Sequence, residues 1–311
     1  MNRRKLIVSL DASLPIFGKR LTRVMAGLAI ETEELTIPSW KDGVLGLLGW
    51  AWKVYRSKSQ IVHYLFGSYH PLIYIIPKLL GKKVIVQWIG SDVMDITSNK
   101  EGLLRKIAYR MVDLHLADFA PLADELEPLG INATVISLPP DIPLVRKDIA
   151  WSIENRVFVY MPEASQELYG SKIVFRLLKE MPDIEFLITR HSGKDAPELP
   201  NVKYLGWVDD IESIWGQVKI YLRSNKHDGL SHTVVEALAR AKHVIWSYEY
   251  PYCHQAHTFE EARDAIRDIL EKNHPNIDGM NYVYERFEPS RLAQDYRCIY
   301  LEVLGGKHGS R

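Results

Sequence analysis

Residues 224–247 read SNKHDGLSHTVVEALARAKHVIWS, and this stretch decides how the second half of the chain is interpreted. A polar loop precedes a short helix that Ser231 is expected to cap, and the apolar run 244–246 predicts a buried strand. Asp228 and Glu236 are eight positions apart, so one carboxylate lies before the helix and the other lies inside it. The helix N-terminus between them has unpaired N–H groups that suit a phosphate. The stretch therefore predicts a nucleotide-sugar site, with hydroxyls bound by the two acids.

These residues resemble the C-terminal domain of the retaining glycosyltransferases of the GT-B fold, specifically the family 4 group. In that group an acid and a glycine precede a helix that has Glu eight positions after the first acid, then an Ala-rich turn and a strand. Asp228, Gly229, Glu236 and residues 237–239 match this pattern, with Asp where Glu is more usual. The resemblance is good over residues 200–250 and elsewhere is mainly an order of strands and helices. It implies an α/β fold of two Rossmann-like, doubly wound parallel-sheet domains that face each other across a cleft.

The resemblance also implies roles for the donor side. Asp228 would bind sugar hydroxyls and Glu236 would hold the ribose, while backbone groups of Gly229, Leu230 and Ser231 would contact sugar and phosphate. Trp207 and Val208 would contact the nucleotide base, although Trp207 is equally suited to covering the sheet edge.

The loop 162–171 departs from the family pattern. Relatives place an Arg in this loop and a Lys just before its Gly, and the two bind the donor diphosphate. This chain has no Arg there, and Tyr169 precedes Gly170. A leaving diphosphate needs cations or N–H donors directed at it. The remaining cationic candidates are Lys172, Arg190 and Lys226.

The acceptor side is predicted near a buried strand at 83–89. Ligands collect at the carboxyl ends of strands in open α/β sheets, and this strand is followed by Gly90, Ser91 and Asp92. Asp92 is the catalytic candidate of this domain, with helix capping or turn formation as the alternative. Ile89 stands where the family often has His. Gly18, in a loop expected at 11–20, is a further acceptor-side candidate.

Alternating strand and helix patterns predict parallel sheets throughout the chain. Three prolines in residues 139–143 are incompatible with a central strand, so a domain boundary is expected there. We predict an N-terminal domain at 1–140, a nucleotide-sugar-binding domain at 141–288, and a C-terminal helix at 289–311 that crosses back to the first domain. Strands are expected at 5–10, 35–38, 61–66, 83–89, 114–117, 133–138, 156–161, 184–189, 202–205, 218–222 and 244–246. Helices are expected at 21–30, 43–58, 71–80, 103–112, 121–129, 172–181, 211–216, 259–272 and 289–304.

Composition fits a globular protein of about two domains: 311 residues, 47% hydrophobic and 25% charged. Two cysteines give no disulfide framework, and residues 1–10 contain too few apolar positions for a signal segment. We therefore expect a cytoplasmic protein, soluble or peripheral at the membrane. Cys253, His254 and His257 form no four-ligand zinc set, so a structural zinc site is not expected. The family resemblance implies a metal-independent reaction without a cofactor.

The net charge is zero, but residues 1–110 hold 17 Lys or Arg against 8 Asp or Glu. Within this basic half, residues 43–58 combine Leu and Trp with three cations. Such a helix suits an anionic membrane surface, and the alternative is a core helix with a solvated basic end. Nucleic acid is not an expected partner, because the basic residues are interleaved with apolar segments.

The family resemblance, together with these features, implies a retaining hexosyltransferase that moves a sugar from a UDP- or GDP-linked donor to a lipid-linked or glycan hydroxyl. Two alternatives stay open. One is a GT-B sugar-nucleotide epimerase. The other is a non-catalytic relative that binds a nucleotide sugar or a glycan as a partner subunit. The absence of His at position 89 and of Arg in the loop 162–171 keeps this alternative open.

Overall fold

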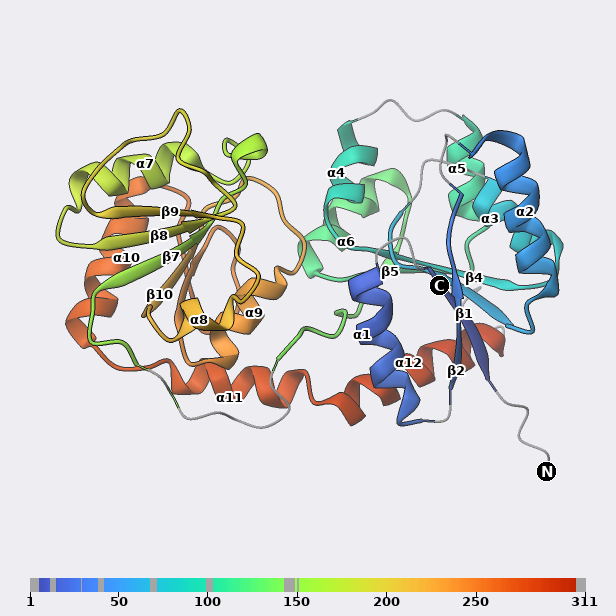
Figure 1. Cartoon of the computed structure of the whole chain (residues 1–311). Helices are drawn as coiled ribbons and strands as arrows, with labels where there is room; N and C mark the ends of the chain where they lie inside the picture. Colours follow the sequence, from blue (N-terminus) through green and yellow to red (C-terminus); the bar gives the residue numbers. More distant parts are fainter. Residues whose placement is uncertain are drawn as a thin grey trace. The chain divides into compact units, whose positions relative to one another are not determined.

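The computed structural model describes residues 6–11, 15–28, 30–38, 42–67, 72–98, 103–142, 149 and 151–305. The chain divides into two compact units (Figure 1). Unit 1 comprises Met1–Pro139 and Phe287–Arg311, and unit 2 comprises Pro140–Arg286. The two divisions lie within two residues of the boundaries expected from the sequence.

Unit 1 is built on a six-stranded parallel sheet in the order β2-β1-β3-β4-β5-β6. Its strands are β1 Ile7–Asp11, β2 Glu31–Leu35, β3 Ile61–Tyr64, β4 Lys83–Trp88, β5 Leu114–Ala117 and β6 Ala133–Val135. Its helices are α1 Pro15–Ala26, α2 Gly43–Arg56, α3 Leu72–Leu79, α4 Ser91–Ser98, α5 Leu103–Arg110, α6 Ala120–Leu126 with a 3₁₀ turn at Glu127–Leu129, and α12 Pro289–Leu304. The order reverses between β1 and β3, as in a doubly wound sheet.

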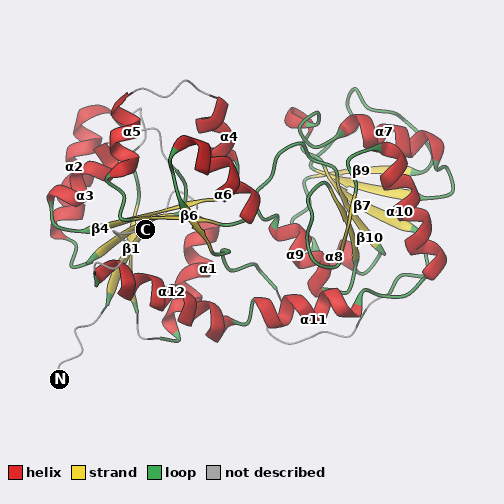
Figure 2. Cartoon of the chain, turned by 180° about the vertical axis from the view of Figure 1, so that it is seen from behind, coloured by secondary structure: helices red, strands yellow, loops and turns green. Residues whose placement is uncertain are grey.

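Two helical layers cover this sheet. Helices α1 and α12 pack together on one face, and α2, α3 and α5 lie on the other (Figures 1 and 2). The C-terminal helix belongs to unit 1 because Tyr296 and Tyr300 are buried in its core. The Tyr296 hydroxyl donates to Gln87 Oε1 over 3.1 Å, and Tyr300 Oη lies 2.9 Å from His63 Nδ1.

Unit 2 is also built on a six-stranded parallel sheet, in the order β12-β11-β10-β7-β8-β9. Its strands are β7 Arg156–Tyr160, β8 Glu185–Thr189, β9 Val202–Gly206, β10 Ile220–Arg223, β11 His243–Trp246 and β12 Cys253–Gln255. Its helices are α7 Ser171–Glu180, α8 Glu212–Trp215, α9 His232–Ala239, α10 Phe259–Lys272 and α11 Ile277–Arg286, with a 3₁₀ turn at Glu163–Ser165. Strands β10 and β11 are buried along their whole length, which explains the apolar runs Ile220–Leu222 and Val244–Trp246 within them.

Local signals account for several element boundaries. Helix α10 begins at Phe259 because Thr258 and Glu261 form a capping box. Helix α12 begins with Pro289 at its first position, where a backbone N–H would have no helical partner, so its absence loses no hydrogen bond. The Glu288 side chain caps this helix by accepting a hydrogen bond from Arg291 N.

The expected elements need correction in a few places. The strand expected at 35–38 runs from Glu31 to Leu35, and α1 starts at Pro15 instead of residue 21. Helix α4, strand β12 and helix α11 were not expected from the sequence. Among the described residues, no helix is long and apolar enough to cross a membrane.

Candidate functional site

The candidate site lies at the carboxyl edge of the unit 2 sheet, in the loop that joins β10 to α9. Ser231 occupies the N-cap position of α9 with an extended backbone, as expected, but its side chain makes no capping hydrogen bond. Gly229, Leu230 and Ser231 are buried. The backbone of this loop therefore leads directly into the first turn of α9, where N–H groups lack helical partners.

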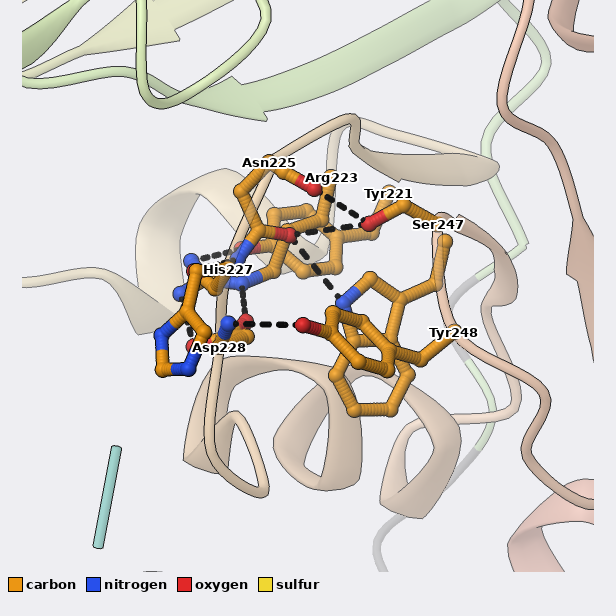
Figure 3. Close-up of polar contacts among 8 residues, drawn as sticks. Tyr221, Arg223, Asn225, His227, Asp228, Ser247 and Tyr248 are labelled. Carbon is orange, nitrogen blue, oxygen red and sulfur yellow. Dashed lines mark hydrogen bonds and ion pairs between the residues drawn. The ribbon is translucent and has the colours of Figure 1, made fainter. Parts of the chain in front are cut away.

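Asn225 fixes the loop from inside (Figure 3). Its Nδ2 donates to the carbonyl oxygen of His227 over 2.8 Å, and its Oδ1 accepts from Trp246 Nε1 over 3.2 Å. Its carbonyl oxygen accepts from Ser247 Oγ over 2.6 Å. These contacts tie the loop to the end of β11, so the position of the following residues is set by buried hydrogen bonds.

Arg223 and Asp228 form a buried bidentate ion pair at the start of this loop (Figure 3). Arg223 Nε donates to Asp228 Oδ2 over 2.5 Å, and Nη2 donates to Oδ1 over 2.9 Å. The side chains are 8% and 13% exposed, so water screens the pair little. The Asp228 N–H donates to Tyr248 Oη over 3.2 Å. The sequence singled out Asp228, but not the cation that holds it.

Aromatic rings surround the Arg223 guanidinium. Its Cζ lies 5.2 Å from the Tyr169 ring and 5.8 Å from the Tyr160 ring, and its Nη1 donates to Tyr221 Oη over 3.4 Å. Burial by itself would lower the pKa of Arg223, but the Asp228 carboxylate outweighs it and raises that pKa well above its usual value. Burial raises the pKa of Tyr221 to about 12. Arg223 is therefore a fixed charge in an otherwise neutral aromatic setting.

A second guanidinium, that of Arg190, lies at the same edge. Arg190 follows β8 with φ +66°, and its Cζ lies 4.0 Å from the Trp207 ring and 5.9 Å from the Tyr160 ring. Trp207 is 68% exposed and its Nε1 donates to Asp209 Oδ1 over 2.6 Å, so it stacks on Arg190 instead of covering the sheet edge. Val208, half-buried, follows it. The ring of Tyr160 thus has a guanidinium within 6 Å on the side of β8 and another on the side of β10.

The loop 162–171 is docked onto the β10–α9 loop. Lys226 N donates to the carbonyl oxygen of Leu168 over 2.8 Å. Gly170, at φ +75°, approaches so closely that an added Cβ would lie 2.1 Å from the carbonyl oxygen of Ser224. Only glycine meets both requirements at this position.

This loop carries acids and amides where the family 4 pattern led us to look for cations. Glu163 Oε2 accepts from Ser192 N over 2.9 Å and from Ser192 Oγ over 2.5 Å. His191 Nε2 lies 3.2 Å from Gln166 Oε1, and burial lowers the pKa of His191 although Glu163 opposes the shift. The side chains of the loop are thus engaged with the end of β8.

The remaining donor candidates are more peripheral. Lys172 and Lys226 are exposed on α7 and on the β10–α9 loop. Glu236 is half-buried inside α9, and its carbonyl oxygen accepts from Arg240 Nη1 over 2.8 Å. Their roles toward a ligand stay predictions.

The acceptor-side candidates lie in unit 1 at the β4–α4 turn. Asp92 is 1% exposed, and its carboxylate accepts N–H groups from Gly67, Ile89, Gly90 and Val93 at 2.8 to 3.1 Å. Burial raises the pKa of Asp92 against the effect of these four bonds. The contacts favour the alternative role in turn formation and helix capping, with exposed Ser91 beside it.

Gly18 does not lie in a loop. Helix α1 starts at Pro15, so Gly18 is in the first turn of that helix. The loop expected at 11–20 is therefore shorter than predicted, and residues 12–14 lie outside the described residues.

Within the described ranges, no group of three or more His, Cys, Asp or Glu side chains is placed to hold a metal ion. Cys253 and His254 are half-buried neighbours on β12.

Two doubly wound parallel-sheet units, each with six strands, define the GT-B architecture, and solved structures share it. A glycosyltransferase from Rickettsia africae has TM-score 0.74 at 13% identity, over 97% of this chain and 99% of that one. Sucrose-phosphate synthase from Thermosynechococcus elongatus has TM-score 0.73 at 11% identity, over 96% and 99%. Anabaena HepE in complex with UDP-glucose has TM-score 0.69 at 12% identity, over 95% and 99%.

No protein-family model and no curated protein matches the sequence. At these identities the structural similarity shows that the chain has the GT-B fold of glycosyltransferases.

Proposed function

We propose that the chain is a glycosyltransferase that takes a sugar from a nucleotide diphosphate sugar. One observation carries the proposal: the guanidinium groups of Arg190 and Arg223 lie within 6 Å of the same Tyr160 ring. Both arginines follow or end parallel strands, at the edge where α/β sheets bind ligands. The shared fold supports the proposal, because HepE was solved in complex with UDP and with UDP-glucose.

Arg190 replaces the missing cation of the loop 162–171, and Arg223, buried and ion-paired with Asp228, adds positive charge behind it. A diphosphate placed at this edge would meet Arg190, together with the N-termini of α7 and α9. Guanidinium groups form strong charge-assisted hydrogen bonds with phosphate, and helix N-termini add unpaired N–H donors. Exposed Lys172 and Lys226 would supply further positive charge at the rim.

The sugar and nucleoside would bind on either side of the diphosphate. Asp228 gives two of its lone-pair positions to Arg223, so the other two are left for sugar hydroxyls. The backbone of residues 229–231 would contact sugar and phosphate, Glu236 would hold the ribose, and Trp207 with Val208 would contact the base. UDP is the favoured nucleotide, with GDP as the alternative.

The proposed reaction is metal-independent and retains the anomeric configuration, as in family 4. An acceptor hydroxyl attacks the anomeric carbon on the face from which the diphosphate leaves. The bond from that carbon to the phosphate oxygen breaks as the new glycosidic bond forms, and the hydroxyl proton passes to the leaving phosphate. The hexosyl acceptor is a lipid-linked or glycan hydroxyl. Asp92 would shape the acceptor side by fixing the backbone of Gly90.

A second candidate function has its own support. Asp228 is already occupied by Arg223, and Glu163 places an acid in the loop where cations are expected. Both features suit a non-catalytic subunit that binds a nucleotide sugar without transferring it. A sugar-nucleotide epimerase is the remaining alternative.

A transfer assay distinguishes these functions. The wild type is incubated with radiolabelled UDP- and GDP-sugars and with lipid-linked and oligosaccharide acceptors, with and without EDTA. The proposal predicts labelled acceptor, released nucleotide and no effect of EDTA. Arg190→Met should lower kcat/KM by about 10- to 100-fold, whereas Arg267→Met, on an exposed arginine of the same unit, should not. Binding without transfer would favour the subunit, and nucleotide release without labelled acceptor would favour the epimerase.

A further inference from the structure

Helix α2 presents an apolar stripe to solvent. Val44, Leu45, Leu48, Trp52 and Tyr55 are each between 58% and 83% exposed. At 100° per residue, their positions fall within a single arc of about 100° around the helix. The buried residues of α2 project from the opposite side. Helix α2 therefore has two apolar faces. One is buried against the core of unit 1, and the other is exposed to solvent.

The aromatic end of the stripe is ordered and lies beside a cation. The Trp52 and Tyr55 rings stack with centroids 5.5 Å apart, and Arg56 Cζ lies 5.9 Å from the Trp52 ring. Lys53 and Lys58 are also exposed. Aromatic rings beside Lys and Arg are typical of helices that lie at a membrane interface.

The neighbouring helices extend this surface. Helix α3 packs between α2 and α5 on the same face of the sheet (Figures 1 and 2). Leu79 on α3 is 77% exposed and Ile107 on α5 is 44% exposed. Exposed apolar side chains are thus distributed over three adjacent helices, and an uncovered apolar area of this kind marks an interaction site.

The charge of this face selects the partner. Helices α2, α3 and α5 contain no Asp or Glu, and the sequence has no acidic residue from position 43 to position 91. Among the described side chains of the three helices, Lys53, Arg56 and Arg110 are exposed cations, and Lys78 is ion-paired with Asp113 over 2.7 Å. A second copy of the same face would bring like charges together, whereas anionic lipid headgroups complement it.

We propose that α2, with α3 and α5, docks unit 1 on an anionic phospholipid bilayer. Leu45 and Leu48 enter the boundary of the acyl chains, Trp52 and Tyr55 lie at the level of the headgroups, and Lys53 and Arg56 contact lipid phosphates. This docking is independent of the donor site, so its failure and the failure of the proposed function are separate outcomes.

Vesicle co-sedimentation tests this docking with the full-length chain. Vesicles contain phosphatidylcholine alone or with 30% phosphatidylserine or phosphatidylglycerol. We expect binding to the anionic vesicles that weakens with added salt. Lys53→Glu with Arg56→Glu should lower partitioning by about 30-fold or more, and Leu45→Ser with Trp52→Ser by about tenfold or more.

Matched controls remove exposed groups elsewhere. Ile153→Ser changes a fully exposed apolar residue of unit 2, Leu301→Ser changes one on the opposite helical layer of unit 1, and Lys179→Glu reverses an exposed cation on α7. These three variants should bind like the wild type. The proposal is overturned if the wild type does not bind anionic vesicles, or if the α2 variants bind as well as the controls. It is also overturned if light scattering shows a dimer that the α2 variants abolish.

Discussion

Replacing Asp228 with alanine would leave the Arg223 guanidinium buried without its carboxylate. The wild-type pair is bidentate, with contacts of 2.5 and 2.9 Å, and both side chains are largely removed from water. Breaking such a pair from one side costs about 3 to 5 kcal/mol, because the remaining charge is desolvated and unpaired. We therefore expect Asp228→Ala to lower the free energy of unfolding by about 3 kcal/mol. For a unit of this size that corresponds to a fall in Tm of about 6 to 12 °C.

The matched control is an exposed bidentate pair in the same unit. Arg267 and Asp183 have side chains 50% and 53% exposed, so Asp183→Ala should cost at most about 1 kcal/mol. Urea unfolding, followed by circular dichroism, measures both variants. The double variant Arg223→Met with Asp228→Leu should recover most of the loss, since neither charge is then left unpaired. Equal, small effects of Asp228→Ala and Asp183→Ala would refute the buried ion pair.

Three further predictions test the packing, the pH response and the donor site. Gly170→Ala should lower the free energy of unfolding, measured in urea, by about 2 kcal/mol or more, because the added Cβ would collide with Ser224. Gly130 has the same φ of +75° but open space around it, so Gly130→Ala should lower the free energy of unfolding by only about 1 kcal/mol. Burial lowers the pKa of His63 to about 3, so the unfolded state binds more protons and stability falls as pH drops from 6.5. His63→Gln should remove about 2 kcal/mol of the loss in unfolding free energy between pH 7 and pH 5. Glu236→Ala should raise the donor KM at least tenfold; unchanged steady-state kinetics would contradict its ribose role.

The sequence predicted the central strands of each sheet and the edge strands β6 and β9, but it misplaced the edge strand β2 and missed the edge strand β12. Strands β4 and β11 contain the apolar runs Val84–Val86 and Val244–Trp246 because neighbouring elements cover both faces of these strands. Strand β2 reads ETEEL and β12 reads CHQ, and both are edge strands with little burial to impose a pattern. These segments are strands because they pair with a neighbouring strand. The pattern of residues within one segment does not reveal that pairing.

The site shows the same division between local and long-range information. Ser231 at the start of α9 and the acid before it could be predicted from local spacing. Arg223 was missed because it ends a buried strand and its role depends on Tyr160 and Tyr169, which come from a distant part of the chain. Asp92 was predicted as a catalytic residue, with turn formation and helix capping as the alternative. Three of the N–H groups that it accepts, those of Ile89, Gly90 and Val93, are local, and only that of Gly67 comes from a distant part of the chain.

A thermal-shift screen against UDP, GDP, ADP and their sugar conjugates tests the central claim most directly. A ligand at 100 times its Kd adds about 2.7 kcal/mol to stability. The account predicts a selective shift with UDP or UDP-sugars that Glu236→Ala and Arg190→Met reduce and Arg267→Met leaves unchanged. No stabilisation by any nucleotide, or an equal shift in all the variants, would contradict a nucleotide-sugar site at the carboxyl edge of the unit 2 sheet.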